Sequence, residues 1–388
     1  KLNGGKPEMS RLYVIEALMT QTGANADHRL RSKASDVYGF AAAIAGRVGV
    51  AGFSDGGISD VKWVEKCVED LKKAGKEALV VAGHRQPMAV HVLAHAMNQV
   101  LGSLGETVEL LPADDLGVPV AGSLAELKSA IGGVDTLVML GGNPVYDAPS
   151  DLGWSEAQRK VQTVVRLAYR EDESAEGCHL HLPKAHYLES WGDARTNDGT
   201  LVPIQPLIAP LFGGLTELEV LGAFAGMKAP IAHKITRETY KQLTGEDDWK
   251  ERWKFYLHSG FEKNTTAAPE AGSEVDVLAA KTGVTNPSRS DDLEVVFARD
   301  YSVDDGRFSN NGWCQELPDP ITKITWDNAV LVSRATAAER KWTNGLQVKI
   351  TVGDKTLTAP VWIQPGQADN TLVLALGYGR DKGGRIAN

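Results

Sequence analysis

Two glycines follow a predicted strand, in a position that could bind a ligand. Residues 137–147 read Leu-Val-Met-Leu-Gly-Gly-Asn-Pro-Val-Tyr-Asp, so Gly141 and Gly142 come directly after an apolar run. Open α/β sheets bind ligands at the carboxyl ends of their strands, and glycine lets the backbone approach a phosphate or a ring closely. A tight turn before Pro144 explains the same residues, and the local sequence by itself favours the turn.

The densest polar stretch, residues 189–200, contains carboxylates that could act as an acid and a base. Glu189, Asp193 and Asp198 are close in sequence, and proton transfer needs such groups within hydrogen-bonding reach of the reacting atoms. However, Asn, Asp and Thr also bond to their own backbone in turns. Because nothing in the pattern makes the carboxylates converge, we expect a hydrogen-bonded loop and no catalytic residue.

The histidines and cysteines do not predict a metal site. His91 and His95 lie four residues apart on an apolar helix and could share a zinc ion, but no third ligand is evident. His179 and His181 would point to one side of a strand, with His186 beyond it. A metal ion is again the less favoured interpretation. Iron-sulfur and zinc sites need thiolates grouped at short spacing. The three cysteines, Cys67, Cys178 and Cys314, stand far apart. We therefore expect buried free thiols and no metal.

No other catalytic or phosphate-binding motif is present in the sequence. There is no Ser/His/Asp order, nucleophile elbow or P-loop. The segment Gly52–Gly57 lacks the lysine of a P-loop and the spacing of a dinucleotide fingerprint. We expect it to be a turn.

Composition narrows the class of protein. The 388 residues are 43% hydrophobic and 23% charged, as in a globular protein with more than one core. The net charge of -9 argues against a nucleic-acid partner, because phosphate backbones are bound by clustered Lys and Arg.

No apolar run of about 18 residues occurs, so we predict no membrane span. Because Lys1 stands in place of an initiator Met and the end is glycine-rich from Gly377, we expect truncation at both ends.

Strands and helices are predicted to alternate through most of the chain. Apolar runs bounded by turn residues predict strands, and apolar residues at helical spacing predict helices. The predicted strands are Leu12–Ala17, Ala78–Ala82, Thr107–Leu111, Thr136–Leu140, Thr163–Leu167 and Cys178–Leu182. The predicted helices are Ser35–Val48, Val61–Ala74, Pro87–Leu101, Leu124–Ile131 and Trp249–Leu257, the last with an aromatic face. This alternation implies parallel sheets with crossover helices.

The pattern changes after a linker. Glu262–Ser273 is rich in Thr, Ala, Pro and Gly and predicts a loop. Short alternating runs follow at Glu294–Ala298, Ala329–Ser333, Leu346–Val352, Leu357–Ile363 and Thr371–Leu376. Gly353 and Asp354 separate two of these runs as a hairpin turn would. We therefore predict an all-β terminal domain.

Several segments, in the same order, resemble the large subunits of the dimethyl sulfoxide reductase family. They are Thr22–Leu30, Leu140–Pro144, Leu182–Glu189, Thr196–Gly199, and Asn328–Lys349 with Pro360–Gly379. The first resembles a Thr-Ala-Asp segment that opens the family's third domain, and the second resembles its Gly-Asn-Pro loop. The last resembles the terminal barrel that closes over the pterin cofactor.

The resemblance completes the predicted fold class: parallel-sheet Rossmann-like α/β domains followed by a C-terminal β-barrel. The expected boundaries are 1–125 for a Rossmann-like domain, 126–261 for a second α/β domain, 262–289 for the linker and 290–388 for a truncated barrel. If a pterin dinucleotide is bound, the resemblance implies that Gly142, Asn143, Pro144 and Asn197 line its site. In the favoured interpretation these four positions are vestigial.

A narrower resemblance is to the molybdopterin-like half of the large iron-sulfur subunit of alternative complex III. It is carried by Ala26–Arg29, Asp193–Thr200, Ile204–Ile208 and Asn310–Trp313. This family is implied to oxidise quinol and to pass electrons through iron-sulfur centres and haems. Its molybdopterin-like half is understood to hold no molybdenum, and its clusters lie in a ferredoxin-like half that we expect after Asn388.

One departure bears on the cofactor. Cofactor-binding members of the wider family carry a Pro-Gly-Thr-Asp turn shortly after the aspartate matched by Asp27. This chain has Arg31-Ser32-Lys33-Ala34-Ser35-Asp36 there, so the glycine that permits close approach is missing and only Asp36 matches. Lys33 could still meet a phosphate as a point charge. We interpret the turn as one that has lost the nucleotide.

Three functions remain open on the sequence. The favoured one is a non-catalytic, periplasmic scaffold without a cofactor of its own, which docks the ferredoxin-like half of the same subunit and membrane quinol-binding and haem subunits. The alternative is an active oxidoreductase that binds molybdopterin guanine dinucleotide. The third is a soluble α/β protein that binds an unknown small molecule.

Overall fold

The structure, a computed structural model, describes residues 2–3, 6–7, 9–53, 58, 60–112, 122–245, 247–270, 277 and 293–387. Most of the predicted turn at Gly52–Gly57 and most of the predicted linker beyond Glu270 lie outside these ranges. Residue contacts divide the chain into two compact units, each formed by two separate segments. Unit 1 comprises Lys1–Leu110 with Glu270–Tyr378, and unit 2 comprises Leu111–Pro269 with Gly379–Asn388.

The first segment of unit 1 is mainly helical. Its strands are β1 (Leu2–Asn3), β2 (Lys6–Pro7), β3 (Tyr13–Glu16) and β4 (His28–Arg31), and its helices are α1 (Gln21–Ala24), α2 (Val37–Val48), α3 (Val61–Ala74) and α4 (Met88–Leu101). Strands β3 and β4 pair in parallel. Glycines with positive φ, Gly49 and Gly102, follow α2 and α4, as is common where helices end. One predicted strand and three predicted helices of this segment are confirmed.

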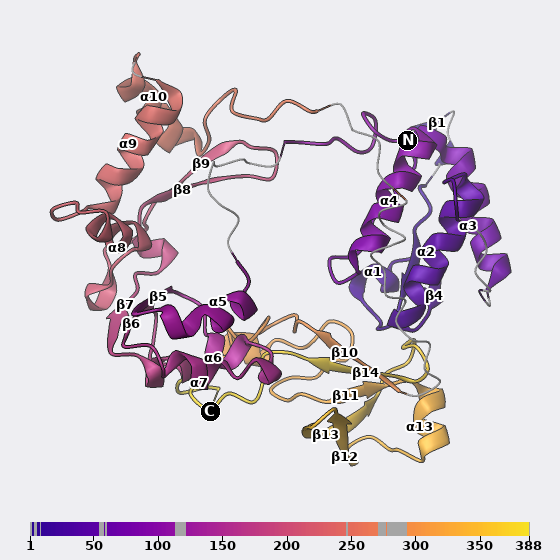
Figure 1. Ribbon diagram of the computed structural model, residues 1–388. Helices are drawn as coiled ribbons and strands as arrows, with labels where there is room; N and C mark the ends of the chain where they lie inside the picture. Colours follow the sequence, from indigo (N-terminus) through magenta and orange to yellow (C-terminus); the bar gives the residue numbers. More distant parts are fainter. Residues whose placement is uncertain are drawn as a thin grey trace. The chain divides into compact units, whose positions relative to one another are not determined.

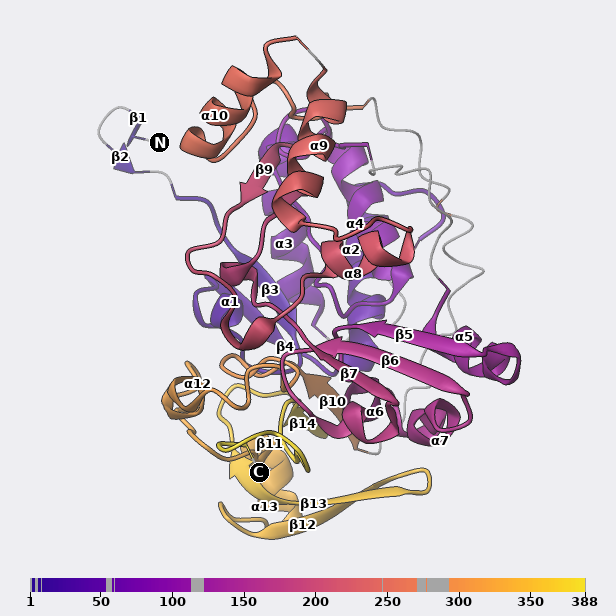
Figure 2. The same ribbon diagram turned by 90° about the vertical axis from the view of Figure 1, so that its left-hand side faces the viewer.

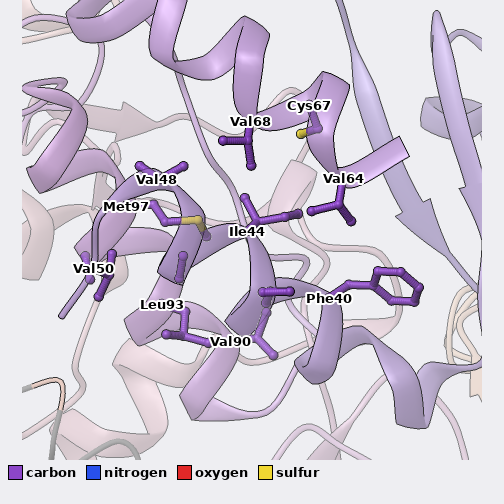
Figure 3. Close-up of a cluster of buried hydrophobic side chains, with 14 of the residues drawn as sticks. Phe40, Ile44, Val48, Val50, Val64, Cys67, Val68, Val90, Leu93 and Met97 are labelled. Atoms are coloured by element: carbon purple, nitrogen blue, oxygen red, sulfur yellow. The ribbon is translucent and has the colours of Figure 1, made fainter. Parts of the chain in front are cut away.

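Helices α2, α3 and α4 enclose a hydrophobic core (Figure 3). Each helix contributes buried residues three or four positions apart, as expected for an amphipathic helix. The core includes Phe40, Ile44 and Val48 from α2, Val64, Cys67 and Val68 from α3, and Val90, Leu93 and Met97 from α4. Together these residues fix the three helices against one another.

Two predicted strands of this segment are wrong. Ala78–Ala82 contains no strand, and Thr107–Leu111 contains only isolated bridges. The side-chain amide of Asn98 takes the place of a neighbouring strand: it donates to the Val80 carbonyl and accepts from the Val80 N–H, both at 2.8 Å. Because these backbone groups are already satisfied, they do not need a ladder partner.

The second segment of unit 1 forms a five-stranded sheet in the order β10-β14-β11-β13-β12 (Figure 1). The strands are β10 (Glu294–Ala298), β11 (Val330–Val332), β12 (Gln347–Val352), β13 (Lys355–Ile363) and β14 (Thr371–Ala375). The sequence predicted all five of these strands. The hairpin at Gly353 and Asp354 is also confirmed, with Val352 opposite Lys355.

The prediction of an all-β barrel needs correction in two respects. Helices α12 (Gly312–Glu316) and α13 (Arg334–Arg340) lie within the segment. The pairs β10–β14 and β11–β13 are parallel, and the described strands leave β10 and β12 as open edges. The sheet is therefore a mixed half-barrel.

Unit 2 is built on a three-stranded parallel sheet in the order β5-β6-β7 (Figure 2). Its strands are β5 (Thr136–Leu140), β6 (Thr163–Ala168) and β7 (Leu180–Pro183), and the accompanying helices are α5 (Leu124–Ala130), α6 (Pro144–Asp147) and α7 (Trp154–Gln158). Leu137, Met139 and Val164 pack with Trp154 on the face that these helices cover. The predicted parallel sheet is confirmed here, together with its three strands and the helix predicted at Leu124–Ile131.

The rest of unit 2 contains elements that the sequence did not predict. They are the antiparallel hairpin of β8 (Gly192–Arg195) and β9 (Leu201–Ile204), and the helices α8 (Glu217–Phe224) and α9 (Ala232–Thr244). The predicted aromatic helix is confirmed as α10 (Trp249–Ser259). Its Trp253 and Tyr256 pack with Tyr240 of α9 and Leu201 of β9.

Candidate functional site

The Gly-Asn-Pro loop lies at the carboxyl end of β5, as predicted. Gly141 and Gly142 have φ values of 80° and 70°, a left-handed conformation that favours glycine. The Gly141 N–H donates to the Leu167 carbonyl at 2.8 Å and so extends the ladder with β6. The chain then enters α6, with Pro144 at the first helical position. The local sequence therefore explains both the turn and the helix start.

The polar groups of the loop are bonded within the protein. The Asn143 amide nitrogen donates to Glu173 Oε2 at 2.7 Å. The Asn143 amide oxygen accepts from the backbone N–H and the hydroxyl of Ser174, at 3.1 and 2.7 Å. The Gly142 carbonyl accepts from an Nη of Arg166 at 2.6 Å. The loop is thus held by hydrogen bonds from inside the protein, and these bonds include both polar atoms of the Asn143 amide.

Two buried ion pairs support this loop. Arg166, only 1% exposed, pairs with Asp172 at 2.7 Å. Glu173 pairs with Arg380 at 2.7 Å, with side chains 8% and 7% exposed, and the Arg380 guanidinium lies 4.5 Å from the Tyr146 ring centroid. Burial raises the pKa of Glu173, but hydrogen bonds from Arg380 and Asn143 outweigh it, so the pKa falls well below its ordinary value. Glu173 is therefore an ionised anchor of the loop.

Asn197, the fourth predicted site residue, lies on a different element. It is exposed in the turn between β8 and β9, whereas Asn143 is buried. In the same turn Asp198 accepts from the Thr196 hydroxyl and, at 3.1 Å, from the Thr200 N–H. This turn is the hydrogen-bonded loop that the sequence predicted. Asn197 takes no part in the hydrogen-bond network around Asn143.

The other two carboxylates of this stretch also have separate surroundings. Glu189 accepts from the His186 N–H at 3.0 Å as part of a capping box. Asp193 is half-buried on β8, and its burial raises its pKa. The three carboxylates of this stretch therefore have different neighbours.

In unit 1, the carboxylate of Glu294 lies against the turn at Ala34 and Ser35, where the resemblance implies a nucleotide in cofactor-binding members. The N–H groups of Ala34 and Ser35 donate to the two carboxylate oxygens of Glu294 at 2.6 and 3.3 Å. The Thr371 hydroxyl also donates to Glu294, at 3.1 Å. These backbone N–H groups precede α2 and would suit an anion. Here the protein supplies that anion itself.

The histidines that were considered as metal ligands belong to no metal-binding group within the described residues. Within the described ranges, no group of three or more His, Cys, Asp or Glu residues could hold a metal ion. His179 Nδ1 accepts from the Val164 N–H at 3.0 Å, which is a structural bond. The three cysteines are free thiols, but only Cys67 is fully buried, and burial raises its pKa to about 12. The described helices also include none that is both long and apolar enough to cross a membrane.

Sequence reasoning missed the residues that hold the loop. Arg166 offered a signal, because an arginine inside the apolar run Thr163–Ala168 is rarely buried without a partner. The pair of Glu173 and Arg380 offered none, because the two residues are 207 positions apart in sequence.

Fold and site together define a mixed α/β protein with parallel sheets, a half-barrel sheet and an internally bonded glycine loop at a strand end. A solved structure similar to this chain is acetylene hydratase from Pelobacter acetylenicus, with a TM-score of 0.57 and 13% sequence identity. The match covers 95% of this chain and 66% of that one, so the chain spans slightly less than two thirds of its neighbour.

At this identity the likeness shows the fold alone. Acetylene hydratase belongs to the dimethyl sulfoxide reductase family, so the resemblance seen in the sequence agrees with the structure at the level of the fold. No family model matches the chain, and no curated protein matches it.

Proposed function

We propose that this chain has a molybdopterin-enzyme fold that no longer binds the cofactor, and that it acts as a scaffold in a quinol-oxidising membrane complex of the alternative complex III type. In this role it performs no bond chemistry. It holds the ferredoxin-like, cluster-bearing half of the same subunit at the periplasmic face and docks it onto quinol-binding and haem subunits.

The contact of Glu294 with the turn at Ala34 and Ser35 carries the proposal. A nucleotide phosphate at this turn would need the same two N–H groups, and like charges at hydrogen-bonding distance repel strongly. The Glu294 carboxylate would have to leave before a phosphate could bind. The side chains in the turn, which replace the family's glycine, add bulk at the same place.

The Gly-Asn-Pro loop supports the same conclusion. An amide that reads a pterin or a nucleobase needs free donor and acceptor atoms, but the Asn143 oxygen already accepts two bonds from Ser174 and its nitrogen donates one to Glu173. Pro144 has no N–H to offer, and Asn197 lies on another element. The residues present do not fit a pterin dinucleotide, and we derive no reaction step through one.

The test is chemical analysis of the full-length protein isolated from its native membrane. We expect no stoichiometric molybdenum, no pterin in the acid-oxidised extract, and co-purification with iron-sulfur, haem and membrane subunits. Stoichiometric molybdenum and pterin would establish the alternative, an active molybdopterin-dependent oxidoreductase. Isolation as a free single chain without haem or iron would contradict the scaffold role.

A further inference from the structure

A large apolar pocket in unit 2 lies apart from the Gly-Asn-Pro loop. It has a volume of about 1080 Å³ and is lined by β6, β7, α8 and the segment 206–216. Its floor contains Val165, Leu180 and Leu182, on the sheet face opposite the core under α5–α7. A pocket of this size is ample for a small molecule.

The floor of the pocket is unusually open for a parallel sheet. Parallel sheets are normally covered on both faces, yet Leu180 is 50% exposed, and Leu207 on the pocket wall is 77% exposed. Water on this much apolar surface costs free energy that a bound molecule would recover. The pocket therefore favours an apolar ligand.

Two polar side chains that line the pocket have hydrogen-bonding groups without a partner among the described residues. Ser190 and His233 line it, and neither side chain makes a hydrogen bond to any other described residue. The His233 ring contacts the Trp191 indole, with centroids 4.6 Å apart, so the wall beside these polar atoms is aromatic. Such a wall suits a planar ring, and the adjacent polar atoms suit one hydrogen-bonding group on it.

Charge narrows the class of ligand further. The lining contains the carboxylates of Glu189 and Glu219 and neither Lys nor Arg. Both carboxylates are held in place by capping bonds, from the N–H groups of His186 and Thr216 at 3.0 Å each. An anionic ligand would meet two fixed negative charges without a cation to offset them.

We propose that this pocket binds an aromatic small molecule that carries no negative charge and has one hydrogen-bonding group, with Trp191 and His233 against its ring. The site is independent of the scaffold function and stands whether or not the chain binds a pterin.

The test uses two fluorescent dyes of matched shape on the full chain at pH 7. Phenylnaphthylamine is uncharged, and anilinonaphthalene sulfonate is its anionic analogue. We expect saturable binding of the uncharged dye at one site per chain and at least about tenfold weaker binding of the sulfonate. Equal affinity for the two dyes would overturn the proposal.

A matched pair of variants locates the site. Ala223 is exposed on α8 and lines the pocket, so Ala223→Trp should fill it and weaken dye binding about tenfold or more. Ala338 is equally an exposed helical alanine, on α13, and Ala338→Trp should leave the affinity unchanged. Unchanged binding by Ala223→Trp, with the fold intact by circular dichroism, would overturn the assignment.

The hydrogen-bonding group is tested by displacement of the dye. Naphthol should compete roughly threefold to tenfold better than naphthalene, as one hydrogen bond allows. In His233→Phe, which keeps the aromatic wall, this preference should shrink. Equal competition by the two compounds in the unmodified chain would contradict the polar part of the proposal.

Discussion

Arg380 is the residue whose loss should affect the glycine loop most. Replacing it by Met leaves the Glu173 carboxylate buried without its cation, and breaking such a pair costs about 3–5 kcal/mol. We expect that loss in the unfolding free energy of unit 2, measured by urea denaturation. The double variant Glu173→Gln/Arg380→Met should recover part of it.

A surface ion pair provides the control. Lys254 and Glu251 are 71% and 76% exposed, and exposed pairs contribute at most about 1 kcal/mol. Glu251→Gln should therefore change stability little. If it costs as much as Arg380→Met, burial is not what makes the Glu173 pair important.

Glu173 should also make stability depend on pH. Its pKa in the folded protein lies below its value in the unfolded chain, so its contribution is complete above the ordinary glutamate pKa and is lost as pH falls toward the folded value. The stability gap between the unmodified chain and Arg380→Met should narrow from pH 7 to pH 3. A gap that widens on acidification would contradict the account.

At the scale of elements, the α2–α4 core offers a matched comparison on one helix. Val90 and Val100 both lie on α4, but Val90 is 6% exposed and Val100 is 50% exposed. Val90→Ala should cost about 2 kcal/mol, because it removes two buried carbon groups at about 0.8 kcal/mol each and leaves a cavity. Val100→Ala should cost less than about 0.5 kcal/mol. Equal shifts in thermal unfolding would contradict the burial pattern.

Elements whose apolar residues repeat at a clear helical spacing could be predicted from the sequence. The helix at Val61–Ala74 has the predicted bounds, because its apolar face repeats clearly and Gly75 ends it. The false strand at Ala78–Ala82 has the apolar composition of a strand, but the Ala78 carbonyl accepts hydroxyl bonds from Ser103 and Thr107 at 2.9 and 2.6 Å. Such tertiary hydrogen bonds leave no signal in a short run.

In the candidate site, too, the sequence could predict local features but not tertiary hydrogen bonds. Gly141 and Gly142 could be placed at a strand end because glycines after an apolar run indicate a turn. The bonds that occupy Asn143 come from Glu173 and Ser174, which lie about 30 positions downstream. Local sequence therefore located the loop, and only the tertiary structure shows that its amide is occupied.

At the scale of the whole molecule, the last residues belong to unit 2 although unit 1 precedes them in sequence. The backbone N–H groups of Asp381 and Lys382 donate to Glu173 at 3.1 Å, and Arg170 donates to the Gly383 carbonyl at 3.2 Å. Deleting Gly379–Asn388 should therefore speed hydrogen exchange in the loop at Gly141–Asp147. Exchange in α2–α4 should not change, and faster exchange there would contradict this division.

We propose that the Glu294 carboxylate occupies the turn where the resemblance implies a cofactor phosphate in related enzymes. An experimental density map of the native full-length protein tests it most directly. We predict Glu294 within hydrogen-bonding distance of the Ala34 and Ser35 N–H groups. A nucleotide phosphate at that turn, with Glu294 displaced, would contradict the account.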